Sequence, residues 1–142
     1  MNPNRYPLIS IITVVYNCKD DLEMTIKSII DQTYPNIEYI VIDGNSNDGT
    51  IDIIKKYQNK ITYWISEPDE GIYDAMNKGI RQSTGDWINF MNAGDRFYDQ
   101  NILSSLFIPA PKPSTDIIYG DTEFIYTFGK YIRKPASLTY LK

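Results

Sequence analysis

Blocks of apolar residues with two different spacings alternate along this chain. Residues 8–16 are almost all apolar and rich in β-branched side chains, which predicts a strand covered on both faces. From residue 20 to 33 the apolar positions fall on one helical face, which predicts a helix with Asp20 or Asp21 as its cap. The alternation continues to residue 91. It predicts further strands at 37–43, 61–66 and 86–91, and helices from near Asp48 and over 72 to about 82.

The third of these helices is expected to bury Ile72, Met76 and Ile80, and to expose Lys78 and Arg81 to solvent. After residue 91 the pattern is less regular. It predicts a short helix at 100–107, a proline-rich loop at 109–113, and short strands at 116–119, 123–128 and 130–133, the last two joined by a turn at 128–130.

Strands and helices alternating at this interval predict an α/β fold, doubly wound and Rossmann-like, with a mostly parallel sheet flanked by helices. The whole chain, 1–142, is interpreted as a single domain. In such sheets ligands bind beyond the carboxyl ends of the strands, because all of those ends lie along one edge. The functional site is therefore expected there.

Polar clusters follow each of the four main predicted strands. They are Tyr16-Asn17, Asp43-Gly44-Asn45, Glu67-Pro68-Asp69 and Asn92-Ala93-Gly94-Asp95. Acids follow three strands that we expect to be adjacent, and neighbouring carboxylates repel each other unless a cation or a donor-rich ligand lies between them. A divalent metal is the simplest answer, with Asp95 as its ligand. The alternative reading of Asp95 is a helix or turn cap.

The composition removes several classes of function. The 142 residues are 42% hydrophobic and 23% charged, as in a globular domain, and contain no histidine. Histidine-dependent nucleophile systems and imidazole zinc sites are therefore excluded. A single cysteine, Cys18, excludes an intramolecular disulfide, and the net charge of −4 argues against nucleic acid as a partner. Neither a signal peptide nor a spanning segment is recognised, so a cytoplasmic location is expected.

The usual glycine-rich phosphate loops are also missing. Neither G-x-x-x-x-G-K-[ST] nor a G-x-G-x-x-G after the first strand is present, which excludes an ordinary P-loop nucleotidase or NAD enzyme. A hard cation held by carboxylate can bind a diphosphate without such a loop, because it bridges the phosphate oxygens. Asp95 is again the candidate ligand of such a cation.

Four segments carry a resemblance to a known family. ISIITVVYN at 9–17, SIIDQTYPNIEYIVIDGNSNDGT at 28–50, SEPDEGIYDAMNKGI at 66–80 and TGDWINFMNAGD at 84–95 resemble the nucleotide-binding half of a family 2 glycosyltransferase with the GT-A fold. The resemblance implies inverting transfer of a sugar from a nucleotide diphosphate donor, first of all a UDP-sugar, with Mg2+ or Mn2+ as cofactor. The implied acceptor is a saccharide or lipid-linked glycan of the bacterial surface, such as polysaccharide or lipopolysaccharide.

The resemblance also implies roles for individual residues. Val14 and Tyr16 are expected against the donor base, Asp43 near the base or ribose, and Asp95 on the metal as the last acid of an Asp-x-Asp-like motif. From the residues alone, packing stays the alternative for Tyr16, and a side-chain cap of the turn at 44–49 stays the alternative for Asp43. The remaining positions expected to contact the donor are Asp69, Asp74, Asn77, Asn92, Ala93 and Gly94.

This sequence departs from the family pattern in two places. The turn after the second strand has Gly44 where a second acid is usual, and Asp95 stands alone where two acids are usual. Asn92 or backbone groups are expected to complete the metal site.

A general base is missing from the recognised segments. Family members carry it in an acceptor-binding half, which we expect beyond Lys142, and Asp121 is interpreted as a turn residue. A non-catalytic or truncated nucleotide-sugar binding module therefore stays as the alternative. A phosphate-accepting receiver domain is disfavoured because the late strands end in Gly120 and Arg133, where a lysine is required.

The apolar tyrosines of the late strands, Tyr119, Tyr126 and Tyr131, are interpreted as a patch for the missing half or for a second copy in a homodimer. Because lipid-linked acceptors are common in the family, peripheral contact with the inner face of the cytoplasmic membrane is compatible with this reading.

Overall fold

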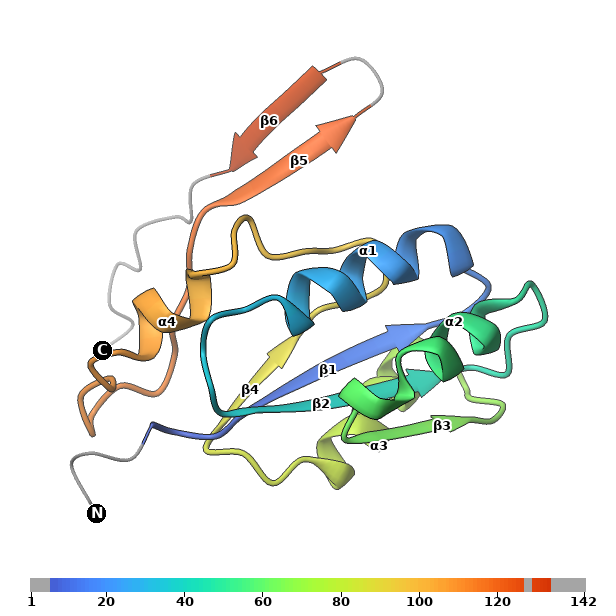
Figure 1. The fold of residues 1–142 in the computed structure, drawn as a ribbon, viewed down its shortest axis with the longest axis horizontal. Coiled ribbons are helices and arrows are strands. Elements are labelled where there is room, and N and C mark those ends of the chain that lie inside the picture. Colours follow the sequence, from blue (N-terminus) through green and yellow to red (C-terminus); the bar gives the residue numbers. More distant parts are fainter. Residues whose placement is uncertain (1–5, 127–128, 134–142) are drawn as a thin grey trace. The chain divides into compact units, whose positions relative to one another are not determined.

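A computed structural model gives the structure of residues 6–126 and 129–133, with the backbone alone for residues 126 and 130–133. The chain forms two compact units, Met1–Ala110 and Pro111–Lys142. The first contains the parallel sheet and its helices, and the second contains a two-stranded hairpin (Figure 1).

The first unit is built on four parallel strands in the order β3-β2-β1-β4. Their bounds are β1 Ile9–Val15, β2 Ile37–Asp43, β3 Tyr63–Ser66 and β4 Trp87–Phe90. β1 and β2 pair over all seven residues, from Ile9 opposite Ile37 to Val15 opposite Asp43. The predicted α/β fold with a parallel sheet is confirmed, and so is the run of β-branched residues as a strand buried on both faces, since every residue of β1 is buried.

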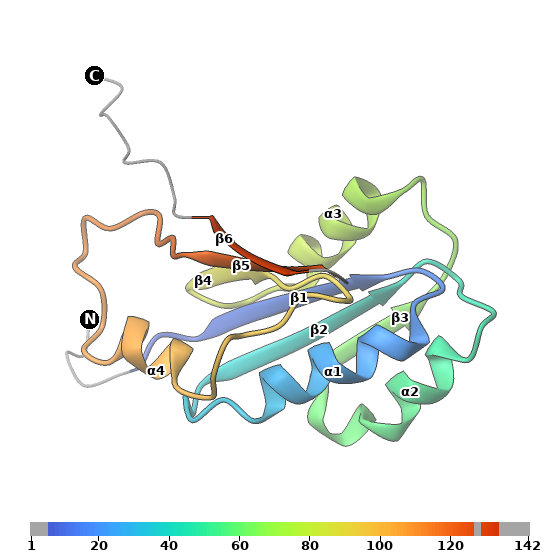
Figure 2. The ribbon, with the colours of Figure 1, turned by 90° about the horizontal axis from the view of Figure 1, so that it is seen from above.

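Helices cover both faces of this sheet (Figure 2). The helices are α1 Lys19–Ile30, α2 Thr50–Lys56, α3 Ile72–Gln82 and α4 Ile102–Phe107, with a 3-10 turn at Gln58–Lys60. α1 and α2 lie together on one face, and α3 lies on the other against β1 and β2. The predicted helices start and end within a few residues of the observed ones, and the short 3-10 turn was not predicted.

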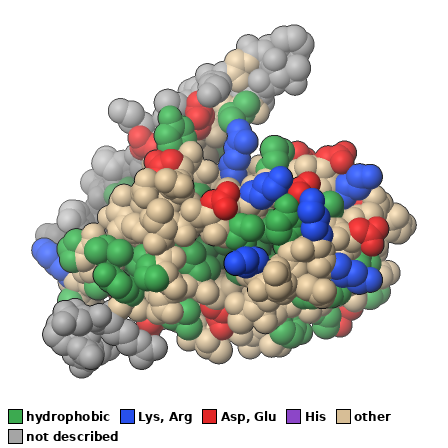
Figure 3. Space-filling model, viewed as in Figure 1, with side chains coloured by type: hydrophobic (Ala, Val, Ile, Leu, Met, Phe, Trp, Pro, Cys, Tyr) green, Lys and Arg blue, Asp and Glu red, His purple; other side chains and the backbone are tan. Residues whose placement is uncertain are grey.

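The surface over α1 and α2 is highly charged, with Lys and Arg side chains among Asp and Glu (Figure 3). Glu23 of α1 accepts from Lys56 of α2 at 2.8 Å and lies 3.4 Å from Lys27. The hydroxyl of Tyr57 donates to the same carboxylate at 2.6 Å. These contacts join the exposed sides of two helices whose buried sides pack on the sheet.

α3 packs through small residues, which corrects the sequence prediction. Ala75 and Gly79 are its buried positions, whereas Ile72 and Ile80 are 49% and 43% exposed and Met76 is half-buried. A Cβ at Gly79 would collide with Cγ2 of Ile12 in β1. The helix axis therefore lies so close to the sheet that the small face points inward and the large apolar side chains flank it.

A hydrogen-bond network lies at the amino-terminal ends of the parallel strands, opposite their carboxyl ends. Glu38 in β2 accepts from the hydroxyls of Ser10 and Thr84 and from the amide of Thr84. Burial raises the pKa of Glu38, but these donors outweigh burial, so the pKa lies below its ordinary value. The carboxylate thereby joins β1, β2 and the turn that precedes β4.

The second unit contains the hairpin of β5 Thr122–Tyr126 and β6 Gly129–Arg133, paired antiparallel. Two of the three predicted late strands are therefore confirmed. The predicted strand at 116–119 is wrong, since these residues have no regular secondary structure. Part of the predicted turn at 128–130, and the side chains of Tyr126 and Tyr131, lie outside the residues described, whereas Tyr119 is 52% exposed.

Candidate functional site

The carboxyl ends of β1 and β2 are joined by a compact set of hydrogen bonds. The amide of Gly44 donates to the carbonyl of Val15 at 2.9 Å, and the amide of Asn17 donates to Ser46 Oγ at 2.8 Å. Asn17 and Asn45 have positive φ angles of 47° and 66°. Such angles turn the chain sharply at each strand end, which asparagine tolerates better than most residues do. The rim of the sheet is thus formed by two tight turns side by side.

Asp43 fixes the second of these turns. Its side chain is fully buried, and it accepts hydrogen bonds from the amide and hydroxyl of Ser46 and from the hydroxyl of Ser66 at the end of β3. Asp43 therefore holds the ends of β2 and β3 together below the surface of the rim. Its predicted contact with a base or ribose stays a prediction, and in this structure its carboxylate is not presented to solvent.

Tyr16, Gly44 and Asp69 form an open corner at the rim, hereafter the rim corner. A Cβ built on Gly44 would lie 2.7 Å from Asp69 Oδ2 and 3.4 Å from Cδ2 of Tyr16. The aromatic ring and the carboxylate therefore flank the same glycine, and the ring is 65% exposed. An exposed ring beside a hydrogen-bond acceptor is suited to a flat, donor-bearing group such as a base.

Val14 lies below this corner rather than on it. Its side chain is 6% exposed and belongs to the apolar cluster that includes Ile12, Ile42 and Ala75. The structure thus brings together Tyr16 and Asp69 of the predicted donor-binding residues, and places Val14 in the core beneath them.

The loop between β3 and α3 carries the next predicted residues. Asp74, in the first turn of α3, accepts from the amide of Glu70 at 3.3 Å and lies 3.4 Å from Lys78 Nζ. Asn77 is exposed. The expectation that Lys78 is solvated is wrong. Its side chain is only 16% exposed, and its ammonium binds Glu67 and the carbonyl of Pro68.

The segment after β4 is fastened both to β1 and to α1. The amide of Ala93 donates to the carbonyl of Val14 at 3.1 Å, and the amide of Gly94 donates to Thr25 Oγ1 at 3.0 Å. The hydroxyl of Thr25 in turn donates to the carbonyl of Asp95 at 2.8 Å. The backbone of Asp95 is thereby fixed, while its exposed carboxylate makes no hydrogen bond or ion pair with the described residues.

Asn92 supplies a second oxygen in this segment. Its Oδ1 atom is buried and has no hydrogen-bond partner within the described part of the chain. A buried, unpaired amide oxygen costs free energy unless a donor or a cation satisfies it. Carboxylate and amide oxygens are ligands that Mg2+ accepts. Asp95 and Asn92 therefore fit a hard cation as a sparse site, to which a ligand would have to add further oxygens.

The expected cluster of acids from three adjacent strands is not formed. β1, whose end carries Tyr16 and Asn17, lies between β2 and β4, and Asp43 is occupied by serine donors. In residues 6–126 and 129–133 no group of three or more acidic or cysteine side chains could hold a metal. The expected repulsion among neighbouring acids is therefore absent, and the metal role of Asp95 stays a prediction.

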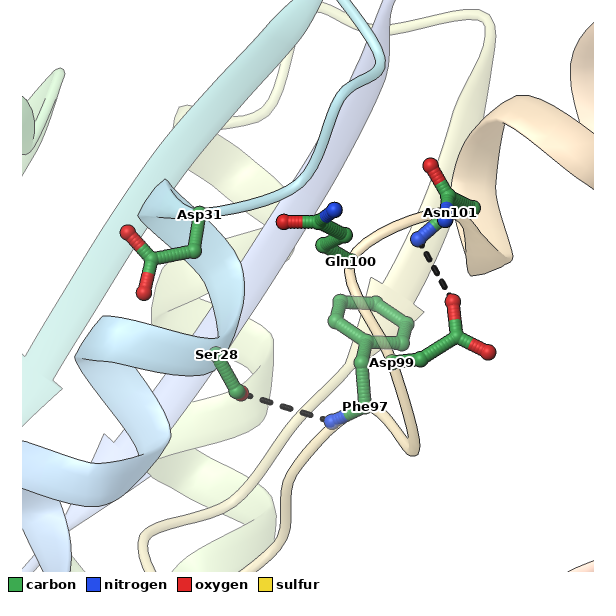
Figure 4. A pocket seen from close by; sticks show the side chains of 6 residues that line it. All are labelled: Ser28, Asp31, Phe97, Asp99, Gln100 and Asn101. Carbon is green, nitrogen blue, oxygen red and sulfur yellow. Dashed lines mark hydrogen bonds between the residues drawn. The ribbon is translucent and has the colours of Figure 1, made fainter.

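A separate hollow of about 460 Å³ lies away from the predicted residues. It is bordered by Ser28 of α1, by Asp31 directly after α1, and by the segment that precedes α4, as Figure 4 shows. The amide of Phe97 donates to Ser28 Oγ at 3.3 Å, and the amide of Asn101 donates to Asp99 at 2.7 Å. The hollow contains none of the residues expected to bind the donor, so the candidate site remains the rim.

Sequence reasoning missed residues that shape the rim without facing a ligand. Ser46 and Ser66 bind Asp43, Thr25 binds the segment of Asp95, and Lys78 binds the loop of Asp69. Except for Ser46, which lies three residues after Asp43, their partners lie 10 to 70 residues away in the sequence, so no local pattern indicates them. Within the residues described, no helix is both long and apolar enough to cross a membrane.

Comparison with known proteins gives a family match. The model described as Glycosyl transferase family 2 matches residues 10–139. An uncharacterized glycosyltransferase of Mycobacterium tuberculosis is 41% identical over 99 residues, covering 69% of this chain and 38% of the relative. A PGL/p-HBAD biosynthesis glycosyltransferase of Mycobacterium bovis is 35% identical over 120 residues, covering 81% and 46%. A putative teichuronic acid biosynthesis glycosyltransferase of Bacillus subtilis is 30% identical, covering 96% and 57%.

The chain therefore spans only 38% to 57% of the length of these curated relatives. Solved structures match the same fold. A mannosyltransferase from Pyrobaculum calidifontis, in complex with GDP-Man and Mn2+, has a TM-score of 0.63 at 24% identity, covering 69% of this chain and 30% of that one. TarS 1-349 of S. aureus, in complex with UDP-GlcNAc, also has a TM-score of 0.63 at 24% identity, covering 69% and 29%.

Proposed function

Because the chain belongs to glycosyl transferase family 2, we propose that it binds a nucleotide diphosphate sugar at the rim and serves in glycosyl transfer to a cell-envelope glycan. The observation that carries this proposal is the Asp95 carboxylate, which is exposed and makes no ion pair with the described residues, on a backbone fixed to α1. In the same segment, the buried Asn92 Oδ1 lacks a hydrogen-bond partner in that described part of the chain. The buried Asn92 Oδ1 costs free energy while it lacks a donor or a cation, and a cation shared with the exposed Asp95 carboxylate would satisfy it.

In this proposal, different rim residues bind different parts of the donor. Tyr16 and Asp69 at the rim corner receive the base, and Asp95 with Asn92 holds Mg2+ or Mn2+ against the diphosphate. A divalent cation there neutralises charge on the departing diphosphate. UDP is the first choice of nucleotide and GDP the second, since related folds have been solved with UDP-GlcNAc and with GDP-Man and Mn2+.

The proposed reaction is inverting. An acceptor hydroxyl oxygen forms a bond to the anomeric carbon from the side opposite the nucleotide, the bond from that carbon to the diphosphate oxygen breaks, and the hydroxyl proton passes to a carboxylate base. The chain's own contribution is to bind and orient the donor. Since this chain spans at most 57% of the curated relatives described above, we propose that the base and the acceptor site belong to polypeptide outside residues 1–142.

The acceptor is proposed to be a saccharide or a lipid-linked glycan, in keeping with the names of the mycobacterial and Bacillus relatives. A cytoplasmic location with peripheral membrane contact, and a homodimer, belong to the same proposal. The second candidate function, a non-catalytic nucleotide-sugar binding module, is favoured by the glycine at position 44 and the solitary Asp95.

Titration calorimetry tests the donor site. We expect UDP to bind the native chain in the presence of Mn2+, to bind at least about tenfold more weakly in EDTA, and to lose this metal dependence in Asp95→Ala. Asp99→Ala, an exposed acid bordering the separate hollow, is the matched control and is expected to bind like the native chain. Metal-dependent binding that Asp95→Ala keeps would contradict the proposed role of Asp95.

Product analysis separates the two candidate functions. A chain extended to the length of the relatives is expected to transfer sugar from its donor to an acceptor, and the product is expected to have the opposite anomeric configuration. Donor binding without transfer in the extended protein would favour the binding module, and retention of configuration would contradict the inverting reaction.

A further inference from the structure

Lys78, in the middle of α3, makes an unusually complete set of contacts for a lysine near the rim. Its Nζ atom lies 2.9 Å from Glu67 Oε1, 2.9 Å from the carbonyl oxygen of Pro68 and 3.4 Å from Asp74 Oδ2. An ammonium group has three hydrogens to donate, so these three acceptors can use all of them. Glu67 foremost, through its hydrogen bond, raises the pKa of Lys78, so the side chain stays charged at neutral pH.

These contacts fasten three parts of the chain to one another. Glu67 directly follows β3, and its amide donates to the carbonyl of Asp43 at 3.0 Å. Pro68 begins the loop, and Asp74 lies in the first turn of α3. Lys78 therefore attaches the start of the loop between β3 and α3 to the α3 helix.

Asp69 lies in the part of the loop between Pro68 and Asp74, both of which contact Lys78. Its Oδ1 atom accepts from the amide of Gly71 at 2.8 Å, and its Oδ2 atom lies over Gly44 at the rim corner. Asp69 Oδ2 has no cation within the described residues to hold it there. Its position depends on the loop, and the loop is held by Lys78.

We propose that Lys78 is a positioning residue for nucleotide binding, which fixes the loop of residues 67–71 so that the Asp69 carboxylate stays beside Tyr16. This inference rests on the proposed function. Lys78 does not contact the ligand in this account, because its three donors already have partners within the loop and α3. It acts through Asp69, whose free oxygen is the acceptor at the edge of the tyrosine ring.

Hydrogen exchange of the ligand-free protein tests the first half of the inference. In Lys78→Met the amides of Glu70 and Gly71, which donate to Asp74 and Asp69, are expected to exchange about fivefold or more faster. Lys60→Met, at an exposed lysine for which the structure shows no ion pair, is the matched control and is expected to leave the loop unchanged. Unchanged exchange in Lys78→Met would overturn the inference.

A double-mutant cycle with UDP and Mn2+ tests the second half. Lys78→Met is expected to weaken UDP binding about tenfold in the native background and not at all in the Asp69→Asn background, because coupled residues are not additive. Lys78→Arg is expected to restore most of the affinity together with slow exchange. Additive losses would show that Lys78 acts by itself, and affinity restored by Arg without slow exchange would assign the effect to charge alone. Either result overturns the inference.

The two proposals fail in different ways. If the native chain binds UDP and Lys78→Met binds it equally well, only the positioning role is lost. If the native chain binds neither UDP nor GDP, the donor site and the positioning role are both lost, whatever exchange shows about the loop.

Discussion

The hydroxyl of Thr25 donates a 2.8 Å hydrogen bond to the main-chain carbonyl of Asp95, 70 positions later in the chain. The same hydroxyl oxygen accepts from the amide of Gly94 at 3.0 Å. One buried side chain of α1 thus fixes two consecutive residues of the segment after β4. The Asp95 carboxylate is left exposed on a backbone that is held from the helix side.

Thr25→Val removes this attachment while keeping the shape of the side chain. We expect the free energy of unfolding to fall by about 1 kcal/mol, the usual net value of a hydrogen bond, and Mn2+-dependent UDP binding to weaken several-fold. Denaturant titration and calorimetry measure the two effects. Thr33→Val, whose hydroxyl bonds to Asn101 and Ser104, is the control. It should lose comparable stability or less and keep its affinity, and equal loss of affinity in both variants would contradict the account.

Gly79→Ala tests the close packing of α3 on the sheet. Alanine is the better helix former, by about 1 kcal/mol, yet its methyl group would collide with Ile12. We expect a net destabilisation of about 1–3 kcal/mol, as for overpacked cores. Arg81→Ala, at an exposed position of the same helix, should change stability by less than about 0.5 kcal/mol. An equally or more stable Gly79→Ala variant in denaturant titration would show that α3 lies farther from β1 than described.

Glu38 is expected to make stability depend on pH. Its pKa is lower in the folded protein than in the unfolded chain, so its contribution is present above the unfolded pKa of about 4.3 and is lost as the pH falls through the folded pKa. Glu38→Gln should cost about 1–3 kcal/mol at pH 7, because it disturbs the acceptor of three donors, and the difference should shrink toward pH 3. Unfolding measured from pH 3 to 7 checks this. A difference that stays constant would assign the loss to packing.

Gly44→Ala should affect binding more than stability. The added methyl group would lie 2.7 Å from Asp69 Oδ2, the end of a side chain that can rotate away. We expect a change in unfolding free energy below about 1 kcal/mol and a clear loss of UDP affinity, since the carboxylate leaves its place beside Tyr16. Calorimetry on Gly44→Ala with and without Asp69→Ala measures this. If the glycine variant weakens binding equally in both backgrounds, Asp69 is not the residue displaced.

The sheet and its rim could be predicted because their causes are local. The β-branched run around Ile12 specifies a buried strand, and parallel strands bring their ends to one edge, as the adjacency of Tyr16, Gly44 and Asp69 illustrates. The inward face of α3 could not be predicted in this way. Apolar spacing identifies Ile72 and Ile80, but the small residues Ala75 and Gly79 decide how near the helix approaches.

The predicted acid cluster failed because strand order is not a local property. Acids follow β2, β3 and β4 in the sequence, but the order β3-β2-β1-β4 places β1 between β2 and β4. The burial of Asp43 and the ion pairs of Lys78 could not be predicted for a related reason. Their surroundings depend on Ser66 and Pro68, contributed by other turns of the chain, which hydropathy does not reveal.

Paramagnetic broadening of NMR signals tests most directly whether Asp95 holds a divalent cation against a nucleotide at the rim. With UDP present, a small amount of Mn2+ is predicted to broaden the amide signals of Asn92 to Asp95 and of Tyr16, and Asp95→Ala is predicted to abolish this. Broadening centred instead on Asp31 and Asp99, the acids of the separate hollow, would contradict the account.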